Sequence, residues 1–255
     1  YEQVTPDVAF QIGSAASKRA LEIDPLEPSA YINLAADKIY YEYDFPAARA
    51  LLLEARKLAP RLPTVHTLFG TAAAYCGELE EALGHLDAAQ EVDPLFPAIR
   101  ANRGVAYYFA GKFDDANRVF LDLLTEYPQR TATRISLASS LTMCGAYEAA
   151  RNELNAVIEH DPEEASARLA LAILTARDGD KRQAKKIANA VRSSSDIERT
   201  NPSALAGVYA QLGETQESMK WLTLAAESHE GGFAEVQVDP LLAPLVGVDA
   251  FHALL

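Results

Sequence analysis

The sequence has few of the residues that build disulfide frameworks, metal sites or reactive thiols. Only two cysteines occur among 255 residues. Cys76 and Cys144 hold the same position in repeats two units apart, so several helix layers separate them and a disulfide between them is excluded. No Cys-x-x-Cys pair is present, and the five histidines do not stand at metal-ligand spacing. We therefore expect no metal site, and we expect both cysteines to be packing residues.

Sequence features of enzymes and of membrane proteins are also missing. No Gly-x-Gly-x-x-Gly or other phosphate-binding loop occurs, and no apolar run reaches the roughly 18 residues that a membrane helix needs. Carboxylate runs such as 78–81 fall at expected helix starts, where the helix dipole stabilises acids. The sequence therefore predicts no catalytic residue, no cofactor and no membrane contact, and we expect that the protein is not an enzyme.

Basic residues are scarce relative to acidic ones. The chain has 23 lysines and arginines against 36 aspartates and glutamates, a formal charge of −13. Such a surface repels phosphate backbones, so we expect no direct binding of nucleic acid. No secretion signal is visible, which favours a cytoplasmic location. The first residue is Tyr1 rather than methionine, and we expect the chain to be a piece of a larger protein.

A period of 34 residues runs through most of the chain. Single glycines recur at this spacing: Gly77, Gly111, Gly145, Gly179 and Gly213. A small residue follows each glycine after five positions: Ala82, Ala116, Ala150, Ala184 and Ser218. Prolines keep the same spacing: Pro60, Pro94, Pro128 and Pro162. Three series in phase at this period indicate stacked supersecondary units.

Residues 97–130 show what one unit is. Positions 97–110 are compatible with a helix and contain no breaker after the first proline. Gly111 allows the positive φ that ends such a helix. A second helix then carries an apolar stripe and stops before Pro128, because the residue before a proline leaves helical space. Each unit is therefore predicted to be a helical hairpin with a short turn.

Small residues are also periodic within the first helix of each unit. They are Gly70, Gly104, Ala138, Ala172 and Ala206. A large side chain at a close helix crossing would push the two helices apart. We therefore expect these positions to be the points where the paired helices approach most closely.

The combined pattern resembles the tetratricopeptide repeat: small residues at slots eight and twenty, glycine at fifteen and proline at thirty-two. The tryptophan often seen at slot four is absent, and Tyr31, His66, Arg100 and Arg134 stand there. The resemblance implies an all-α fold, a right-handed superhelical solenoid of antiparallel helix hairpins. It implies one continuous solenoid rather than separate globular domains.

The predicted organisation has three parts. Residues 1–25 are expected to hold the second helix of a partial repeat. Residues 28–230 form six hairpins, at 28–61, 63–96, 97–130, 131–164, 165–198 and 199–230. The first hairpin is one residue longer, around Tyr43, and a looser joint is expected near Ser193–Pro202. Residues 231–255 are expected to form a loop and a capping helix that covers the open end of the stack.

The ending of the chain carries a second resemblance. Trp221-Leu222, the run 238–245 and Asp249-Ala250-Phe251 look like the end of bacterial repeat modules. Those modules are joined to winged-helix DNA-binding domains of transcriptional regulators, or to serine/threonine kinase or cyclase domains. The resemblance implies that this chain is the interaction or sensing arm of a bacterial signalling protein.

In such repeats, defined slots of the first helices face the concave surface. The resemblance therefore implies these partner-binding candidates: Asn33, Tyr40, Thr67, Thr71, Tyr75, Asn102, Tyr108, Phe109, Ser136, Ser139 and Met143. Aromatic rings beside hydroxyls and amides suit an extended peptide or an amphipathic helix. For Tyr75, Phe109 and Met143, packing between hairpins is an equal alternative. We expect a protein or peptide partner held in this groove.

Two further possibilities stay open. Lys181, Arg182, Lys185 and Lys186 concentrate positive charge, either as a solvated face or as a docking patch for an acidic surface, including another copy of this chain. Self-association as a dimer or stacked oligomer is thus one alternative to partner binding. The other is a small-molecule sensor with its ligand held around Tyr75, Tyr108 and Phe109.

Overall fold

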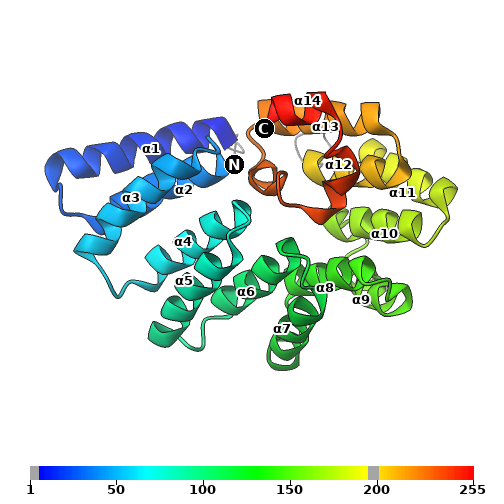
Figure 1. The fold of residues 1–255 in the computed structure, drawn as a ribbon, viewed down its shortest axis with the longest axis horizontal. Coiled ribbons are helices and arrows are strands. Elements are labelled where there is room, and N and C mark those ends of the chain that lie inside the picture. The colour runs from blue at the N-terminus through cyan, green and yellow to red at the C-terminus, as the bar shows by residue number, and fades with distance from the viewer. Residues whose placement is uncertain (1–5, 195–200) are drawn as a thin grey trace.

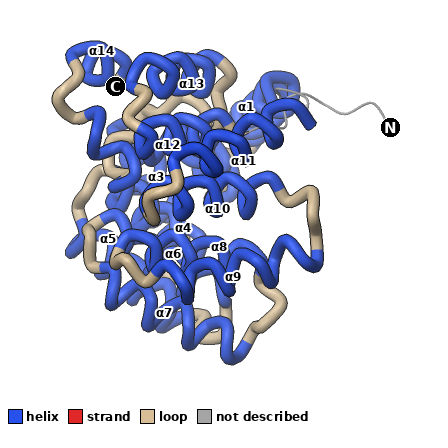
Figure 2. Tube along the Cα trace, turned by 90° about the vertical axis from the view of Figure 1, so that its right-hand side faces the viewer, coloured by secondary structure: helices blue, strands red, loops and turns tan. Residues whose placement is uncertain are grey.

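The computed structural model describes residues 6–194 and 201–255, and over these ranges the chain is helical without a strand (Figures 1 and 2). The predicted all-α solenoid is therefore confirmed. After α1 (Pro6–Ile23), successive helices pair into hairpins. The pairs are α2 (Pro28–Tyr40) with α3 (Phe45–Leu58), α4 (Pro63–Tyr75) with α5 (Leu79–Val92), α6 (Pro97–Phe109) with α7 (Phe113–Glu126), α8 (Thr131–Met143) with α9 (Tyr147–His160), α10 (Ala165–Arg177) with α11 (Lys181–Ser194), and α12 (Pro202–Leu212) with α13 (Thr215–Glu227).

The turns inside the hairpins follow the periodic glycines. Gly111 has φ 70° between α6 and α7, the left-handed conformation that a helix end needs and that glycine adopts without strain. The first hairpin lacks a glycine, and Tyr43 takes the positive φ of 57° there. Its turn is one residue longer than the turn between α4 and α5, as predicted. Asp44 compensates by accepting a hydrogen bond from the Ala47 N–H at the start of α3.

Close helix crossings explain the small residues of the first helices. A Cβ added to Gly104 of α6 would lie 2.4 Å from Cε1 of Phe120 on α7. A Cβ on Gly70 of α4 would lie 2.7 Å from Cγ of Leu86 on α5. At both crossings a core side chain of the second helix fills the space above the glycine. The 34-residue period of small residues in the sequence therefore reflects the close contact between the two helices of each hairpin.

The array curves until its first and last hairpins meet (Figure 1). The Tyr43 hydroxyl donates a hydrogen bond to the Glu230 carbonyl oxygen at 3.0 Å. The His229 ring stacks on Tyr41 at 4.0 Å between centroids, and Tyr41 stacks in turn on Phe10 at 3.7 Å. These contacts join α1 and the first turn to the end of α13, so the superhelix closes on itself.

The C-terminal segment (residues 229–248) differs from the prediction. It was expected to cover the open end of the stack as a loop. Instead its short 3-10 helices, η2 (Gly231–Glu235) and η3 (Pro240–Leu245), turn back into the concave side, where η2 contacts α2 and η3 contacts α12. Only α14 (Asp249–Leu254), packed on α13, lies where a cap was predicted.

The physical reason for this return is apolar burial. Phe233, Val236, Leu241, Leu242 and Leu245 are all buried, in one cluster with α10, α12 and α13. The curved inner surface offers such side chains neighbours on several helices, whereas the end of the stack offers one helix. The looser joint predicted near Ser193–Pro202 falls largely on residues 195–200, outside the described residues.

Candidate functional site

The C-terminal segment occupies part of the concave groove that the sequence predicts for a partner. Gln237 Nε2 donates a hydrogen bond to the Tyr75 carbonyl oxygen at 2.8 Å. Deeper in the groove, the Tyr108 hydroxyl donates to Asp239 Oδ1 at 3.3 Å. The side chain of Tyr108 and the backbone of Tyr75, two residues of the predicted groove, therefore hold the chain's own ending.

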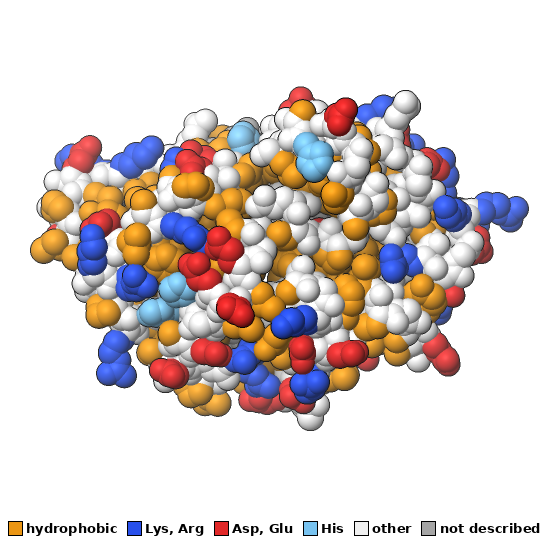
Figure 3. Space-filling view, in the orientation of Figure 1, with side chains coloured by type: hydrophobic (Ala, Val, Ile, Leu, Met, Phe, Trp, Pro, Cys, Tyr) orange, Lys and Arg blue, Asp and Glu red, His pale blue; other side chains and the backbone are white. Residues whose placement is uncertain are grey.

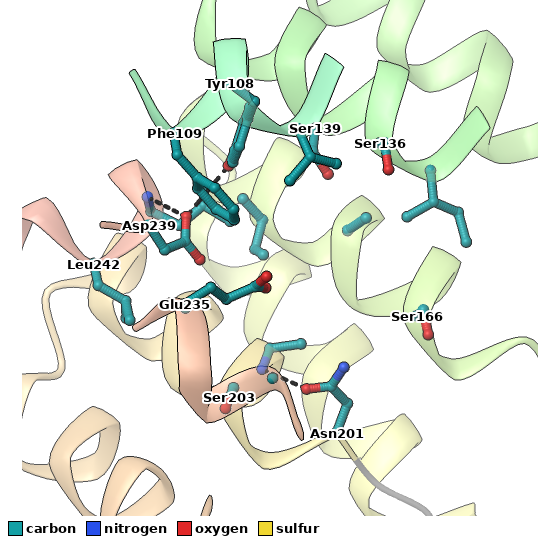
Figure 4. Close-up of a pocket in the computed structure, with 18 of the residues that line it drawn as sticks. Tyr108, Phe109, Ser136, Ser139, Ser166, Asn201, Ser203, Glu235, Asp239 and Leu242 are labelled. Atoms are coloured by element: carbon teal, nitrogen blue, oxygen red, sulfur yellow. Dashed lines mark hydrogen bonds between the residues drawn. The ribbon is translucent and has the colours of Figure 1, made fainter. Parts of the chain in front are cut away.

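A cavity of about 230 Å³ remains between this segment and the inner helices α6, α8, α10 and α12 (Figure 4). Aromatic, hydroxyl and carboxyl groups converge on it from elements far apart in the sequence. Its polar and aromatic lining comprises Tyr108, Phe109, Phe120, Ser136, Ser139, Ser166, Asn201, Ser203, Glu235 and Asp239. Since 230 Å³ is below the usual range of roughly 300–1,000 Å³, the cavity suits a group smaller than a drug-sized ligand.

Two carboxyl groups give the cavity its electrostatic character. Burial raises the pKa of Glu235 to about 8, and the negative charges of Asp239 and Glu230 add to the shift. Burial also raises the pKa of Asp239 to about 6, although hydrogen bonds from the Leu241 N–H and the Tyr108 hydroxyl oppose this shift. No lysine, arginine or histidine is among the described residues that line the cavity. The site therefore holds negative or neutral acid groups without a compensating cation.

Aromatic rings connect the cavity to the first hairpins. Tyr40, Tyr75 and Phe109 come from three successive first helices, and their rings meet edge to face at 6.4 Å and 5.8 Å between centroids. Tyr108 and Phe109 meet in the same way at 5.5 Å. Burial raises the pKa of Tyr75 and of Tyr108 well above the ordinary tyrosine value. Both hydroxyls are therefore neutral at physiological pH and act as hydrogen-bonding groups.

The predicted groove residues separate into two sets. Ser136 and Ser139 line the cavity with Tyr108 and Phe109, while Met143 packs against the core clusters. The second set lies nearer the start of the array. Asn33 and Tyr40 are exposed on α2, Thr67 is half-buried on α4, and the amide of Asn102 lies 3.4 Å from the hydroxyl of the buried Thr71. No hydrogen bond within the described ranges joins Asn33, Thr67 or Asn102 to the C-terminal segment.

The basic side chains of α11 are partly used by the next hairpin. Lys185 Nζ lies 2.7 Å from Glu214 Oε1, and Lys181 Nζ donates to the Leu212 carbonyl oxygen at 3.2 Å. Arg182 and Lys186 are exposed. On the face shown in Figure 3, acidic and basic side chains are interspersed rather than gathered by sign. All four cations of the predicted docking patch are therefore exposed, and two of them, Lys181 and Lys185, also contact the next hairpin.

The cysteines and histidines form no recognisable centre. Both cysteines are free, Cys76 half-buried and Cys144 exposed. Phe69 stacks on His85 at 4.6 Å between centroids, which is a packing contact. Across the part of the chain that the structure describes, no group of three or more potential ligands gathers for a metal ion. No helix in the same part is both long enough and apolar enough to cross a membrane.

Sequence reasoning missed the acidic groups at the centre of the site. The sequence predicts a loop and a capping helix over residues 231–255, which gives Glu235 and Asp239 no place in the groove. One signal was present: the two acids stand four residues apart among apolar residues such as Val236 and Val238. Acids placed in an otherwise apolar segment are unusual unless that segment reaches a specific polar environment.

Comparison with known proteins defines the class to which this fold corresponds. Residues 107–174 match the family model of the tetratricopeptide repeat. No curated protein gives a significant sequence match. The family match to residues 107–174 and the solved structures together support a tetratricopeptide repeat fold.

The similar solved structures agree over most of the chain. A tetratricopeptide repeat protein from Parabacteroides merdae ATCC 43184 is 18% identical, with 92% of this chain and 91% of that chain covered and a TM-score of 0.68. Pseudomonas aeruginosa pilF is 16% identical, with 82% and 96% covered and a TM-score of 0.56. Human IFIT1, solved as a dimer with m7Gppp-AAAA, is 14% identical, with 90% and 57% covered and a TM-score of 0.64. At these identities the likeness concerns the fold alone.

Proposed function

We propose that the chain is a protein-interaction scaffold that binds a peptide or helix along the inner faces of α2, α4 and α6. The observation that carries this proposal is the row formed by Asn33, Thr67 and Asn102, which stand at the sixth, fifth and sixth slots of three successive repeats. Their side chains are exposed or half-buried on the concave side. Amides and hydroxyls in a row, beside the exposed ring of Tyr40, suit the backbone and side chains of an extended segment.

The energetics favour this open part of the groove over the part that the C-terminal segment fills. Five large apolar side chains of that segment are buried, and burial of each is worth about 1.5–3 kcal/mol. Their sum, roughly 7–15 kcal/mol, is as large as the net stability of a typical domain. A partner that displaced the segment would have to offset this whole amount. The proposed partner therefore binds beside the segment and does not replace it.

The proposed context is the regulatory arm of a larger bacterial signalling or transcription-regulator protein. Support comes from the resemblance of the chain's ending, whose Trp221, Leu242 and Phe251 are buried together in the C-terminal core. These residues therefore serve folding in this chain, and the fold alone does not select the parent protein. The sequence upstream of Tyr1 tests this part of the proposal directly.

Peptide selection tests the proposed binding surface. A random peptide library is selected against the immobilised chain, and the affinity of enriched peptides is measured by fluorescence polarisation. Asn33→Ala and Tyr40→Ala are expected to weaken binding by at least about fivefold, since anchoring residues typically contribute 1 kcal/mol or more. Asn155→Ala, at an exposed asparagine of α9, is the matched control and should leave the affinity unchanged. Equal effects of Asn33→Ala and Asn155→Ala would refute this location.

A further inference from the structure

The cavity contains a carboxyl group without a partner. Glu235 points into the cavity from η2 (Figure 4), and its residual exposure is toward that space. Within the described residues its carboxyl oxygens accept no hydrogen bond and form no ion pair. Asp239, four residues on, accepts two hydrogen bonds, from Leu241 N–H at 2.9 Å and from the Tyr108 hydroxyl. The two acids of the segment thus differ: one is satisfied by the protein, and the other faces the cavity.

Two of the serine hydroxyls that line the cavity present acceptors rather than donors. Ser136 Oγ donates its proton to the Ala132 carbonyl oxygen at 3.0 Å, within α8. Ser203 Oγ donates to Glu230 Oε2 at 2.6 Å. With these protons used, each oxygen keeps lone pairs that can accept a further hydrogen bond. A group that enters the cavity therefore meets acceptor oxygens on Ser136 and Ser203 in addition to the Glu235 carboxyl, and these oxygens suit a group with N–H donors.

Aromatic faces and the absence of a competing cation favour a positively charged group. The rings of Tyr108 and Phe109 line the cavity, and aromatic faces attract cations through their quadrupole. Arg177 of α10 is a cation on a packed helix that acts electrostatically on Tyr108. Its Nη1 donates instead to Gln211 Oε1 at 2.9 Å, and it does not line the cavity. The position opposite Glu235 is therefore left for an exogenous cation.

The volume limits what this cation can be. The cavity's volume of about 230 Å³ lies below the roughly 300–1,000 Å³ of pockets for drug-sized ligands. An ammonium on a short alkyl chain fits this limit, and a nucleotide does not. The apolar part of the lining, which includes Val105, Ile173 and Leu242, suits the alkyl carbons.

We infer that this cavity binds a small primary ammonium group, with Glu235 as its counter-ion and the hydroxyl oxygens of Ser136 and Ser203 among its hydrogen-bond acceptors. The inference goes beyond the proposed protein partner and does not depend on it, because the cavity is separate from Asn33 and Thr67. The ammonium can belong to a free alkylamine or to a lysine side chain, and both present the same chemistry.

Binding is coupled to a proton. Burial keeps the empty Glu235 carboxyl largely protonated at neutral pH, and an ammonium beside it stabilises the carboxylate. The carboxyl proton is then released to the solvent, and nothing else is transferred. The other titratable or charged groups facing this region are Glu230 and Asp239 of the segment, Tyr40 of α2, Tyr75 of α4, Tyr108 of α6 and Arg177 of α10.

Titration calorimetry on the whole chain tests the inference. The probes are n-butylammonium, its neutral isostere n-butanol, and an acetylated Ala-Lys-Ala amide. Titrations near pH 7 in two buffers of different ionisation enthalpy count the protons released. The variant is Glu235→Gln, and Glu227→Gln, at an exposed acid of α13, is the control for net charge. Ser139→Leu, which fills the cavity from α8, is a second variant that leaves the carboxyl in place.

The expected result is saturable binding of n-butylammonium with up to about one proton released, and much weaker binding of n-butanol. Glu235→Gln should weaken the binding at least about tenfold, the value of a charge-assisted hydrogen bond, and Ser139→Leu should weaken it as well. Glu227→Gln should bind as the parent does. Comparable binding of the lysine peptide identifies a side chain as the source, and binding of the amine alone identifies a free amine. No saturable amine binding, equal binding of butanol, or an unchanged affinity in Glu235→Gln would overturn the inference.

Discussion

Glu235 should make the stability of the chain fall as pH rises through the neutral range. Its pKa is about 8 in the folded protein, against an ordinary value of 4.5. Because the folded state favours the protonated carboxyl, the stability associated with this group is complete below about pH 4.5 and is lost as the pH rises toward and through 8. The direction of this pH dependence of stability is opposite to that of a salt-bridged carboxylate.

The size of this change in stability follows from the pKa shift of Glu235. One pH unit in this window corresponds to about 1.4 kcal/mol, so the folded state loses about 2–3 kcal/mol from Glu235 between roughly pH 6 and pH 9. Asp239, with a pKa of about 6, contributes mainly below this window. Glu235→Gln keeps the size of the side chain and removes the charge. The variant should therefore exceed the parent in stability by an amount that grows by about 2–3 kcal/mol from pH 6 to pH 9.

Urea unfolding followed by circular dichroism provides the measurement, repeated at about one-unit pH intervals from 6 to 9. Glu227→Gln, at an exposed acid, removes the same formal charge and should track the parent curve. If the free energies of unfolding of the parent and of Glu235→Gln run parallel across this range, the carboxyl is not desolvated, and the reasoning about the cavity fails.

Two further predictions concern packing. Gly104→Ala should lower the free energy of unfolding by about 1–3 kcal/mol relative to Gly84→Ala, because its Cβ would overlap the ring of Phe120. Gly84 has open space around it, and both substitutions gain the same helix propensity. Equal stability of the two variants in urea unfolding would contradict the close crossing. Leu242→Ala should lower the free energy of unfolding by about 2–5 kcal/mol, because this side chain of the C-terminal segment is buried. Val246→Ala, at a side chain 56% exposed, should change it by less than about 0.5 kcal/mol. Similar thermal unfolding of the two variants would argue that the C-terminal segment is not packed.

The fold was predictable because each hairpin is specified locally. Gly111 ends one helix, and Gly104 marks the crossing within the same hairpin. Both signals lie within one 34-residue unit and return in the next. Even the irregular first turn could be located, because the missing glycine and the extra residue near Tyr43 break the period at one point.

The site was less predictable because its position depends on the small rotations between successive hairpins, added up over the whole array. The contacts of Tyr43 with Glu230 and of Tyr41 with His229 join positions 187 and 188 residues apart. They exist only because six hairpins together curve enough to bring both ends of the array side by side. No local pattern specifies that curvature, so the sequence indicated the helices that face the groove but not the segment that fills it. The acidic character of the cavity followed from that segment and was missed with it.

The C-terminal segment lies inside the concave surface, against the second hairpin. A methyl carbon of Val238, Cγ1, lies 3.7 Å from the point where a Cβ on Gly77 would lie, although the two residues are far apart in the sequence. The most direct test is a nuclear Overhauser measurement on methyl-labelled protein. A cross-peak between the Val238 methyl protons and the Gly77 α-protons is expected. Assigned resonances for both groups without this cross-peak, with the Val238 methyl at a random-coil shift, would contradict this placement of the segment.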